Sequence, residues 1–208
     1  MNRVLIAAVV AGGILAGAGA AWLAFGGRGE PPPLEHATRF DSPRPLPAFA
    51  LVDSSGASFG PERLRGRWTF LFFGFANCPD ICPTTLATLA AVRTSLADLP
   101  EDQRPSVLFV SVDPGRDTPE ALGRYVAHFD PAFTGATGTR EAIEALTAAL
   151  GVAVFVGPPD ADGNYAVDHS AAVFLVDPAA RVAALFGTPH EVDPIARDYR
   201  RLVAGGPA

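Results

Sequence analysis

The chain has 208 residues, of which 49% are hydrophobic and 18% are charged, a composition that supports a packed core and excludes disorder throughout. Its 22 acidic residues outnumber 16 basic ones, giving a net charge of −6, and every basic residue is an arginine. The lack of lysine excludes Schiff-base catalysis and a phosphate-binding loop of the Walker A type. An acidic chain also argues against nucleic acid as a partner.

The amino-terminal segment is uncharged over 22 consecutive positions, Val4–Phe25, which follow Arg3. A helix of that length extends about 33 Å and matches the hydrocarbon thickness of a bilayer. We therefore expect residues 1–25 to form a transmembrane anchor, with the amino terminus inside and the rest of the chain exported. A cleaved signal peptide, with small residues at 16–18 after a shorter apolar region, is the alternative. Both interpretations place the remaining chain outside the cytoplasm.

A proline-rich segment, residues 26–47, follows the expected anchor. It holds six of the 20 prolines, namely Pro31, Pro32, Pro33, Pro43, Pro45 and Pro47. Such a composition predicts a semi-rigid, extended linker that holds the domain away from the membrane. The linker contains His36, for which we expect no functional role. The sequence thus predicts an anchor over residues 1–25, a linker over 26–47 and a domain over 48–208.

Strand-like and helix-like segments alternate through the predicted domain. Residues 49–53 and 57–59 are typical of a hairpin, and the apolar run 68–76 is typical of a central strand buried on both faces. Further along the chain, the hydrophobic patterns predict helices over 83–99, 118–129, 140–150 and from 191, and strands over 106–112, 152–156, 171–176 and 182–186. This alternation, with its late antiparallel pair of strands, predicts a three-layer α/β domain with a thioredoxin-like fold.

The chain has two cysteines, Cys78 and Cys82, which lie between the predicted central strand and the helix that follows it. Two cysteines are too few for a disulfide scaffold. A helix amino terminus stabilises a thiolate, so we expect a lowered pKa and the greater reactivity at Cys78. The spacing of four brings the sulfurs to one side of a first helical turn, where they could join as a disulfide or bind one metal ion. Asp80, between them, is typical of an acid at a helix start rather than of a ligand.

Among the four histidines, His169 has the most informative position, because it lies two residues before the predicted strand 171–176. In thioredoxin-type domains the segment that leads into this strand packs against the active cysteines. Two thiolates and one imidazole form a soft ligand set that suits Cu(I) and leaves a position open for Cu(II) or for a partner's ligand. Asp168 is then expected to orient the imidazole without binding the metal. His128 and His190 are expected to be structural.

Three motifs occur in order along the chain: CPDICP after the central strand, then SVDPGRDTPEALGRYVAHFD, and finally YAVDHS before a late strand. Together they resemble the Sco/SenC family over about residues 49–202. The resemblance implies a thioredoxin-like fold, attachment to a membrane, and assistance in assembling the CuA centre of cytochrome c oxidase. It also implies that Cys78, Cys82 and His169 bind copper. The loop 113–117 matches a family segment, and we expect a structural role for it.

Two functions remain open at this point. The first hypothesis is a membrane-tethered copper chaperone that binds Cu(I) or Cu(II), acts on subunit II of cytochrome c oxidase, and faces the periplasm from a bacterial inner membrane. The alternative is a thiol–disulfide reductase or redox sensor acting on cuproprotein cysteines, in which His169 is incidental. A peroxiredoxin-like peroxidase is disfavoured, because Phe75 stands where that class has an activating threonine. We expect a metallochaperone rather than an enzyme, although the thiol pair could support oxidoreductase activity.

Overall fold

The computed structural model describes residues 13, 33–162 and 164–204. The chain divides into two compact units, Met1–Pro33 and Leu34–Ala208, and the second unit is the folded domain. The expected anchor, residues 1–25, lies outside the described residues except for Gly13. Across the described ranges, no helix combines the length and the apolar character that crossing a bilayer requires.

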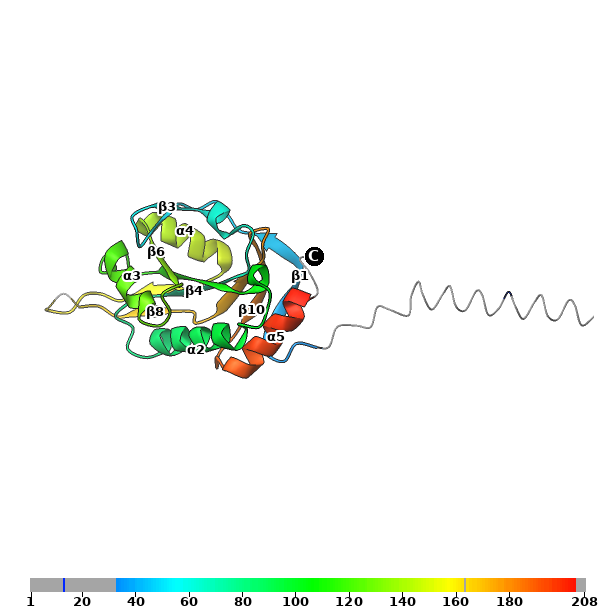
Figure 1. The fold of residues 1–208 in the computed structure, drawn as a ribbon. Helices are drawn as coiled ribbons and strands as arrows, with labels where there is room; N and C mark the ends of the chain where they lie inside the picture. The colour runs from blue at the N-terminus through cyan, green and yellow to red at the C-terminus, as the bar shows by residue number, and fades with distance from the viewer. Residues whose placement is uncertain (1–12, 14–32, 163, 205–208) are drawn as a thin grey trace, which may run out of the picture. The chain divides into compact units, whose positions relative to one another are not determined.

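An eight-stranded mixed sheet forms the centre of the domain, in the order β1-β10-β9-β4-β5-β6-β2-β3 (Figure 1). Strands β4, β5 and β6 run parallel, whereas the other neighbouring pairs are antiparallel. A separate two-stranded sheet contains β7 and β8. The bounds are β1 Ala37–Pro45, β2 Leu51–Asp53, β3 Ser58–Phe59, β4 Thr69–Gly74, β5 Ser106–Ser111, β6 Thr134–Thr137, β7 Val154–Val156, β8 Val167–His169, β9 Val173–Val176 and β10 Arg181–Phe186.

The central strand is β4, and all six of its residues are buried. Because successive side chains of a strand point to opposite faces, Phe70 and Phe72 enter one core while Leu71 and Phe73 enter the other. A strand buried in this way needs cover on both faces, which explains the unbroken apolar run in the sequence. The predicted central strand is confirmed.

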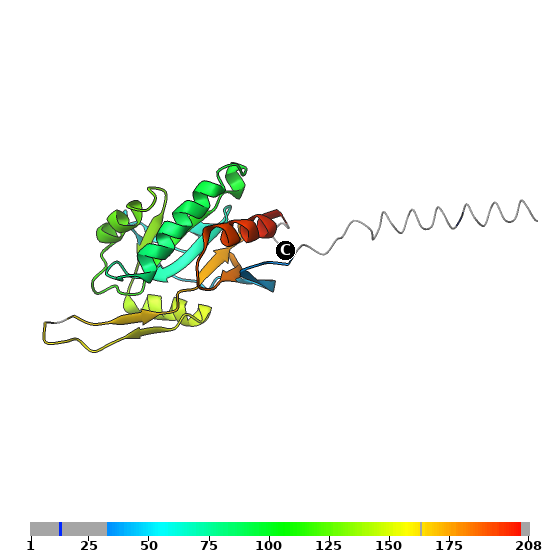
Figure 2. The same ribbon diagram turned by 90° about the horizontal axis from the view of Figure 1, so that it is seen from below.

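Helices cover both faces of the sheet (Figure 2). The core that contains Phe70 and Phe72 also receives buried side chains from three helices, α2 (Ile81–Ser95), α3 (Pro119–Ala127) and α5 (Val192–Ala204). The opposite core is covered by α4 (Arg140–Leu150), which contributes Ile143 and Leu146. This arrangement confirms the predicted three-layer α/β domain.

The predicted linker is wrong over its carboxyl-terminal part, because residues 37–45 form β1 and pair with β10 at the edge of the sheet. Proline lacks an amide hydrogen, and an edge strand tolerates it because one side of the strand forms no ladder. The preceding residues are also fixed: Asp198 of α5 is fully buried and accepts hydrogen bonds from the backbone N–H groups of Glu35, His36 and Ala37 at 2.7–2.9 Å. His36 also places Nε2 2.8 Å from the carbonyl oxygen of Gly187. The domain therefore begins before residue 48.

Two further differences concern short strands. The predicted strand 152–156 is not in the main sheet: β7 pairs only with β8, and the two form a hairpin that extends from the domain (Figure 2). The sequence also did not predict β6, whose residues Thr134–Thr137 lack a bulky apolar pattern. The close approach of α3 favours a small residue there, because a Cβ at Gly135 would lie 3.1 Å from Cβ of Leu122.

Candidate metal centre

The two cysteines lie where β4 passes into α2. Cys78 is in the connecting turn, and its N–H donates to the carbonyl of Phe75 at 3.2 Å. Cys82 is the second residue of α2, which begins two residues earlier than predicted, and its N–H donates to Sγ of Cys78 at 3.4 Å. Asp80 occupies the position before the helix, as predicted, although its carboxylate accepts from the Thr84 hydroxyl instead of capping a backbone N–H. The helix start therefore directs a donor at the Cys78 sulfur.

Burial differs between the two sulfurs. Cys82 is fully buried and Cys78 is half-buried, and both are free thiols. Burial, with a smaller contribution from the hydrogen bond to Cys78, raises the pKa of the Cys82 thiol far above its usual value. The space for its sulfur depends on Gly74, since a Cβ there would lie 2.7 Å from Sγ of Cys82 and 2.6 Å from the ring of Phe109. Cys78 is thus the sulfur that a partner molecule can reach.

His169 reaches the thiols from the β7–β8 hairpin. Its Nε2 lies 3.3 Å from Sγ of Cys82, and its Nδ1 lies 3.0 Å from the carbonyl oxygen of Ser170. A carbonyl only accepts, so Nδ1 carries the hydrogen and the lone pair of Nε2 faces the sulfurs. Burial lowers the pKa of His169, which keeps the ring neutral. The rings of Phe72 and Phe75 pack edge-on against it, with centroids 6.1 Å and 6.0 Å away.

The sequence suggested that Asp168 orients this imidazole. In the structure, the group that contacts Nδ1 of the ring is the carbonyl of Ser170. Successive side chains of a strand alternate between faces, and in β8 His169 turns inward while Asp168 turns outward and is exposed. Asp168 still acts on His169 through its charge, which raises the histidine pKa slightly against the larger effect of burial.

Three potential ligand atoms meet at this point. The sulfurs of Cys78 and Cys82 and a ring nitrogen of His169 all lie within 4.8 Å of one another. A cavity of about 290 Å³ opens beside them, and its lining includes Phe75, Pro79 and Asp168. The geometry therefore brings together the three residues that the sequence predicted, although the ligand roles themselves remain a prediction.

The other histidines lie elsewhere. His128 is exposed at the end of α3 and packs its ring against Phe129. His190 places Nδ1 3.1 Å from the hydroxyl of Thr85, and its ring packs edge-on against Phe72. Neither belongs to the group of three ligand atoms.

The loop 113–117 supports the site. The sequence predicted a structural role for this loop but not which part of the protein it holds. Asp117 is 3% exposed and accepts hydrogen bonds from the N–H of Ala76, two residues before Cys78, at 3.0 Å and from the hydroxyl of Ser111 at 2.6 Å. Burial raises the pKa of Asp117, although these two donors oppose the shift. The role of Asp117 could not be derived from spacing, because Ala76 contributes only a backbone group.

The comparisons with known proteins agree with this geometry. The family model SCO1/SenC matches residues 40–204. The chain belongs to the SCO1/SenC family. It is 35% identical over 207 residues to the mitochondrial protein SCO2 homolog of Bos taurus, covering 98% of this chain and 76% of that protein.

Solved structures of family members share the fold. Arabidopsis thaliana ScoI with copper bound has a TM-score of 0.72 and 32% identity, covering 76% of this chain and 98% of that chain. Apo Sco1 of Thermus thermophilus also has a TM-score of 0.72, with 35% identity over 80% of this chain and 96% of that one. The domain thus has the Sco-type, thioredoxin-like fold.

Proposed function

We propose that this SCO1/SenC protein is a membrane-tethered, extracytoplasmic copper chaperone that assists assembly of the CuA centre of cytochrome c oxidase. The observation that carries the proposal is the convergence of Cys78, Cys82 and His169 within 4.8 Å. The copper-bound state of a 32% identical relative supports the choice of metal.

The donor set fits copper as a cargo. Two thiolates suit Cu(I), and the imidazole nitrogen adds the ligand type that Cu(II) prefers. The neutral ring needs no rearrangement to bind, because the Ser170 carbonyl already fixes the tautomer in which the lone pair of Nε2 faces the sulfurs. The half-buried Cys78 beside the cavity gives a recipient's ligand a route to the metal. The site therefore combines binding with access, as transfer requires.

The test is titration of the reduced full-length protein with Cu(I) and Cu(II). Cys78→Ser and Cys82→Ser should abolish binding of both ions. His169→Ala should weaken the affinity for Cu(II) by more than roughly 100-fold, the upper effect of losing a residue that only supports a ligand. It should weaken the affinity for Cu(I) much less. His128→Ala is the matched control, since this exposed histidine is outside the site. Equal Cu(II) binding by wild type and His169→Ala would contradict the three-ligand site.

The second candidate, a thiol–disulfide reductase acting on cuproprotein cysteines, is favoured by the arrangement of the free thiols. Cys78 would attack a partner disulfide and release one partner thiolate. The buried Cys82 would then attack Sγ of Cys78 and release the second, so that the partner gains two electrons and the pair becomes a disulfide. Oxidase activity in cells separates the candidates: His169→Ala should reduce it for a copper chaperone and leave it intact for a reductase.

The membrane tether and the location are part of the proposal. The support is the uncharged run Val4–Phe25, and the proposed location is the bacterial inner membrane with the domain in the periplasm. The native protein should fractionate with membranes, and its domain should be digested by protease added to spheroplasts. A soluble native protein whose mature amino terminus lies near Ala18 or Ala20 would show that the segment is a signal peptide instead.

A further inference from the structure

Polar contacts beside the metal centre join two segments that are distant in sequence. The carboxylate of Asp113, 2% exposed, accepts a 2.6 Å hydrogen bond from the hydroxyl of Tyr165 and pairs with Arg116. The guanidinium of Arg116 lies 3.9 Å from the centroid of the Tyr165 ring and donates to the Tyr165 carbonyl at 3.2 Å. We call Asp113, Arg116 and Tyr165 the clamp. Its members connect the loop after β5 to the hairpin.

The clamp acts on the segment that carries His169. Tyr165 precedes this histidine by four residues and lies two residues before the first residue of β8. Apart from the contact between His169 and Cys82, the hydrogen bonds from the described part of hairpin 154–169 to the 111–117 loop and the main sheet end on Tyr165. The hairpin is otherwise held by apolar packing, such as that of the buried Val167, which is not directional.

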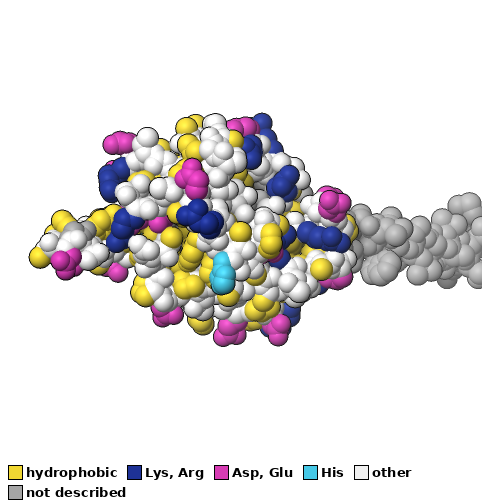
Figure 3. Space-filling model, turned by 60° about the vertical axis from the view of Figure 1, so that its left-hand side comes forward, with side chains coloured by type: hydrophobic (Ala, Val, Ile, Leu, Met, Phe, Trp, Pro, Cys, Tyr) yellow, Lys and Arg dark blue, Asp and Glu magenta, His cyan; other side chains and the backbone are white. Residues whose placement is uncertain are grey.

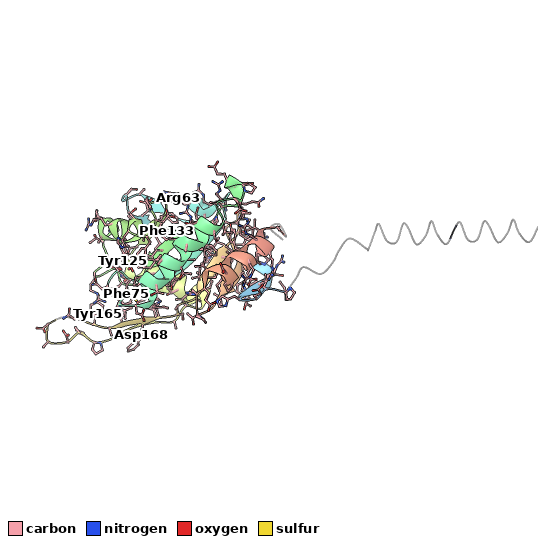
Figure 4. All side chains as sticks on the ribbon, turned by 60° about the horizontal axis from the view of Figure 1, so that its bottom comes forward. Arg63, Phe75, Tyr125, Phe133, Tyr165 and Asp168 are labelled. Atoms are coloured by element: carbon pink, nitrogen blue, oxygen red, sulfur yellow. The ribbon has the colours of Figure 1, made fainter. Side chains whose placement is uncertain are left out.

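The thiol side has its own support from the same loop. Asp117 holds the N–H of Ala76, so that the turn containing Cys78 is fixed without the clamp. Phe75 contacts both sides, with its ring against His169 and 5.9 Å from the guanidinium of Arg116. Figure 4 shows Phe75 on the main body of the domain close to Tyr165 at the hairpin. The loop therefore supports the thiols and the imidazole through separate residues.

We propose that the clamp is the positioning element that holds His169 against the thiol pair and thereby sets the balance between Cu(II) and Cu(I) binding. The inference rests on the copper-binding function proposed above. Cu(I) is satisfied by two sulfurs, whereas Cu(II) needs the nitrogen. When the hairpin is held less firmly, the imidazole is ordered at the site for less of the time, and the affinity for Cu(II) falls first. A change in the clamp should therefore shift the reduction potential of the bound copper upward.

The test compares two tyrosine variants of the full-length protein. Tyr165→Phe removes the bond to Asp113 but keeps the ring under Arg116. The matched control is Tyr199→Phe, which removes a 2.6 Å hydrogen bond to the Gln103 carbonyl from a buried tyrosine of α5. We expect Tyr165→Phe to weaken Cu(II) binding about 10-fold while Cu(I) binding changes less than about 2-fold. A tenfold fall in the affinity for Cu(II) relative to that for Cu(I) raises the one-electron reduction potential of the bound copper by about 59 mV. Tyr199→Phe should leave both affinities unchanged.

Hydrogen exchange of the metal-free protein tests the clamp without copper. Tyr165→Phe should speed exchange of the amides of Val167–His169 and leave those at Cys78 and Cys82 unchanged, and Arg116→Lys should do the same. Unchanged exchange at Val167–His169, or equal weakening of Cu(I) and Cu(II) binding, would overturn the positioning role. If Tyr165→Phe speeds exchange at Val167–His169 but the wild-type protein binds no copper, the proposed function is overturned. The positioning of His169 by the clamp then still stands.

Discussion

The thiol side and the imidazole side of the metal centre are built in different ways. Cys78 and Cys82 follow β4, a strand with no exposed residue, and Cys82 itself belongs to the core. His169 lies on the β7–β8 hairpin, where Phe155 is 65% exposed and directional contacts to the domain are few. The position of the thiols therefore follows from packing of the whole core, whereas the position of the imidazole depends on a few hydrogen bonds.

This difference separates stability from metal chemistry. A change near the thiols should alter folding as well as binding, because the sulfur of Cys82 shares its space with Gly74 and Phe109. A change at His169 should alter the ligand set and leave the free energy of unfolding nearly unchanged. The face of the domain that Figure 3 shows carries scattered arginine and acidic side chains with hydrophobic residues between them.

Truncation before residue 48 should give the largest loss of stability, because it removes β1 and the backbone donors to Asp198 together. A chain that begins at Leu34 should fold, whereas one that begins at Ala48 should lose β1 and the three N–H donors to Asp198. Each hydrogen bond to a charged group contributes about 1.5–3 kcal/mol, so the loss should exceed about 4 kcal/mol. Urea unfolding of the two truncated chains measures it, and equal stabilities would restore the original linker boundary.

Alkylation should show the difference in burial within the thiol pair. In single-cysteine variants, Cys78 should react at least about 100-fold faster than Cys82, since burial raises the pKa of Cys82 and shields its sulfur. Measured across pH with iodoacetamide, the rate for Cys82 should still be rising at a pH where an ordinary thiol is fully ionised. Faster alkylation of Cys82 than of Cys78 would contradict the burial of the Cys82 sulfur.

Substitution of Gly74 tests the packing behind Cys82. Gly74→Ala should destabilise the protein by about 1–3 kcal/mol, the usual cost of overpacking a core, because the new Cβ would overlap Sγ of Cys82 and the ring of Phe109. Gly187→Ala is the matched control, since nothing lies within 4 Å of a Cβ there. Thermal unfolding measures both, with about 2–4 °C per kcal/mol for a chain of this size. A similar midpoint for the two variants would contradict the close packing at the thiol side.

Acid sensitivity should give the smallest effect. Burial lowers the pKa of both His169 and His190 in the folded protein. In the unfolded chain a histidine has a pKa of about 6.5, so below that pH the unfolded chain binds protons that the folded chain does not. Stability should therefore fall on acidification, by at most about 1.4 kcal/mol per pH unit for each histidine. The metal-free His190→Gln variant should show a shallower slope than wild type, because it lacks one of the two buried histidines. Identical slopes for wild type and His190→Gln would contradict the burial of His190.

The sequence predicted the part of the site that depends on packing better than the part that depends on backbone groups. The apolar strand, the helix after it and the three clustered side chains all follow from side-chain patterns. The support by Ser170 and Ala76 does not, because their contributions come from a carbonyl and an N–H that any residue carries. Residues 37–45 were misassigned because prolines mask a strand that is stable only when β10 offers an open edge.

The three-ligand centre is tested most directly by the electron paramagnetic resonance spectrum of the Cu(II)-loaded protein, prepared with histidine labelled by the heavy nitrogen isotope. The copper should couple to one histidine nitrogen and show the charge-transfer absorption of bound thiolates. This coupling should disappear in His169→Ala and persist in both His128→Ala and His190→Ala. A spectrum without histidine coupling in the wild type, or one unchanged by His169→Ala, would contradict a centre made of Cys78, Cys82 and His169.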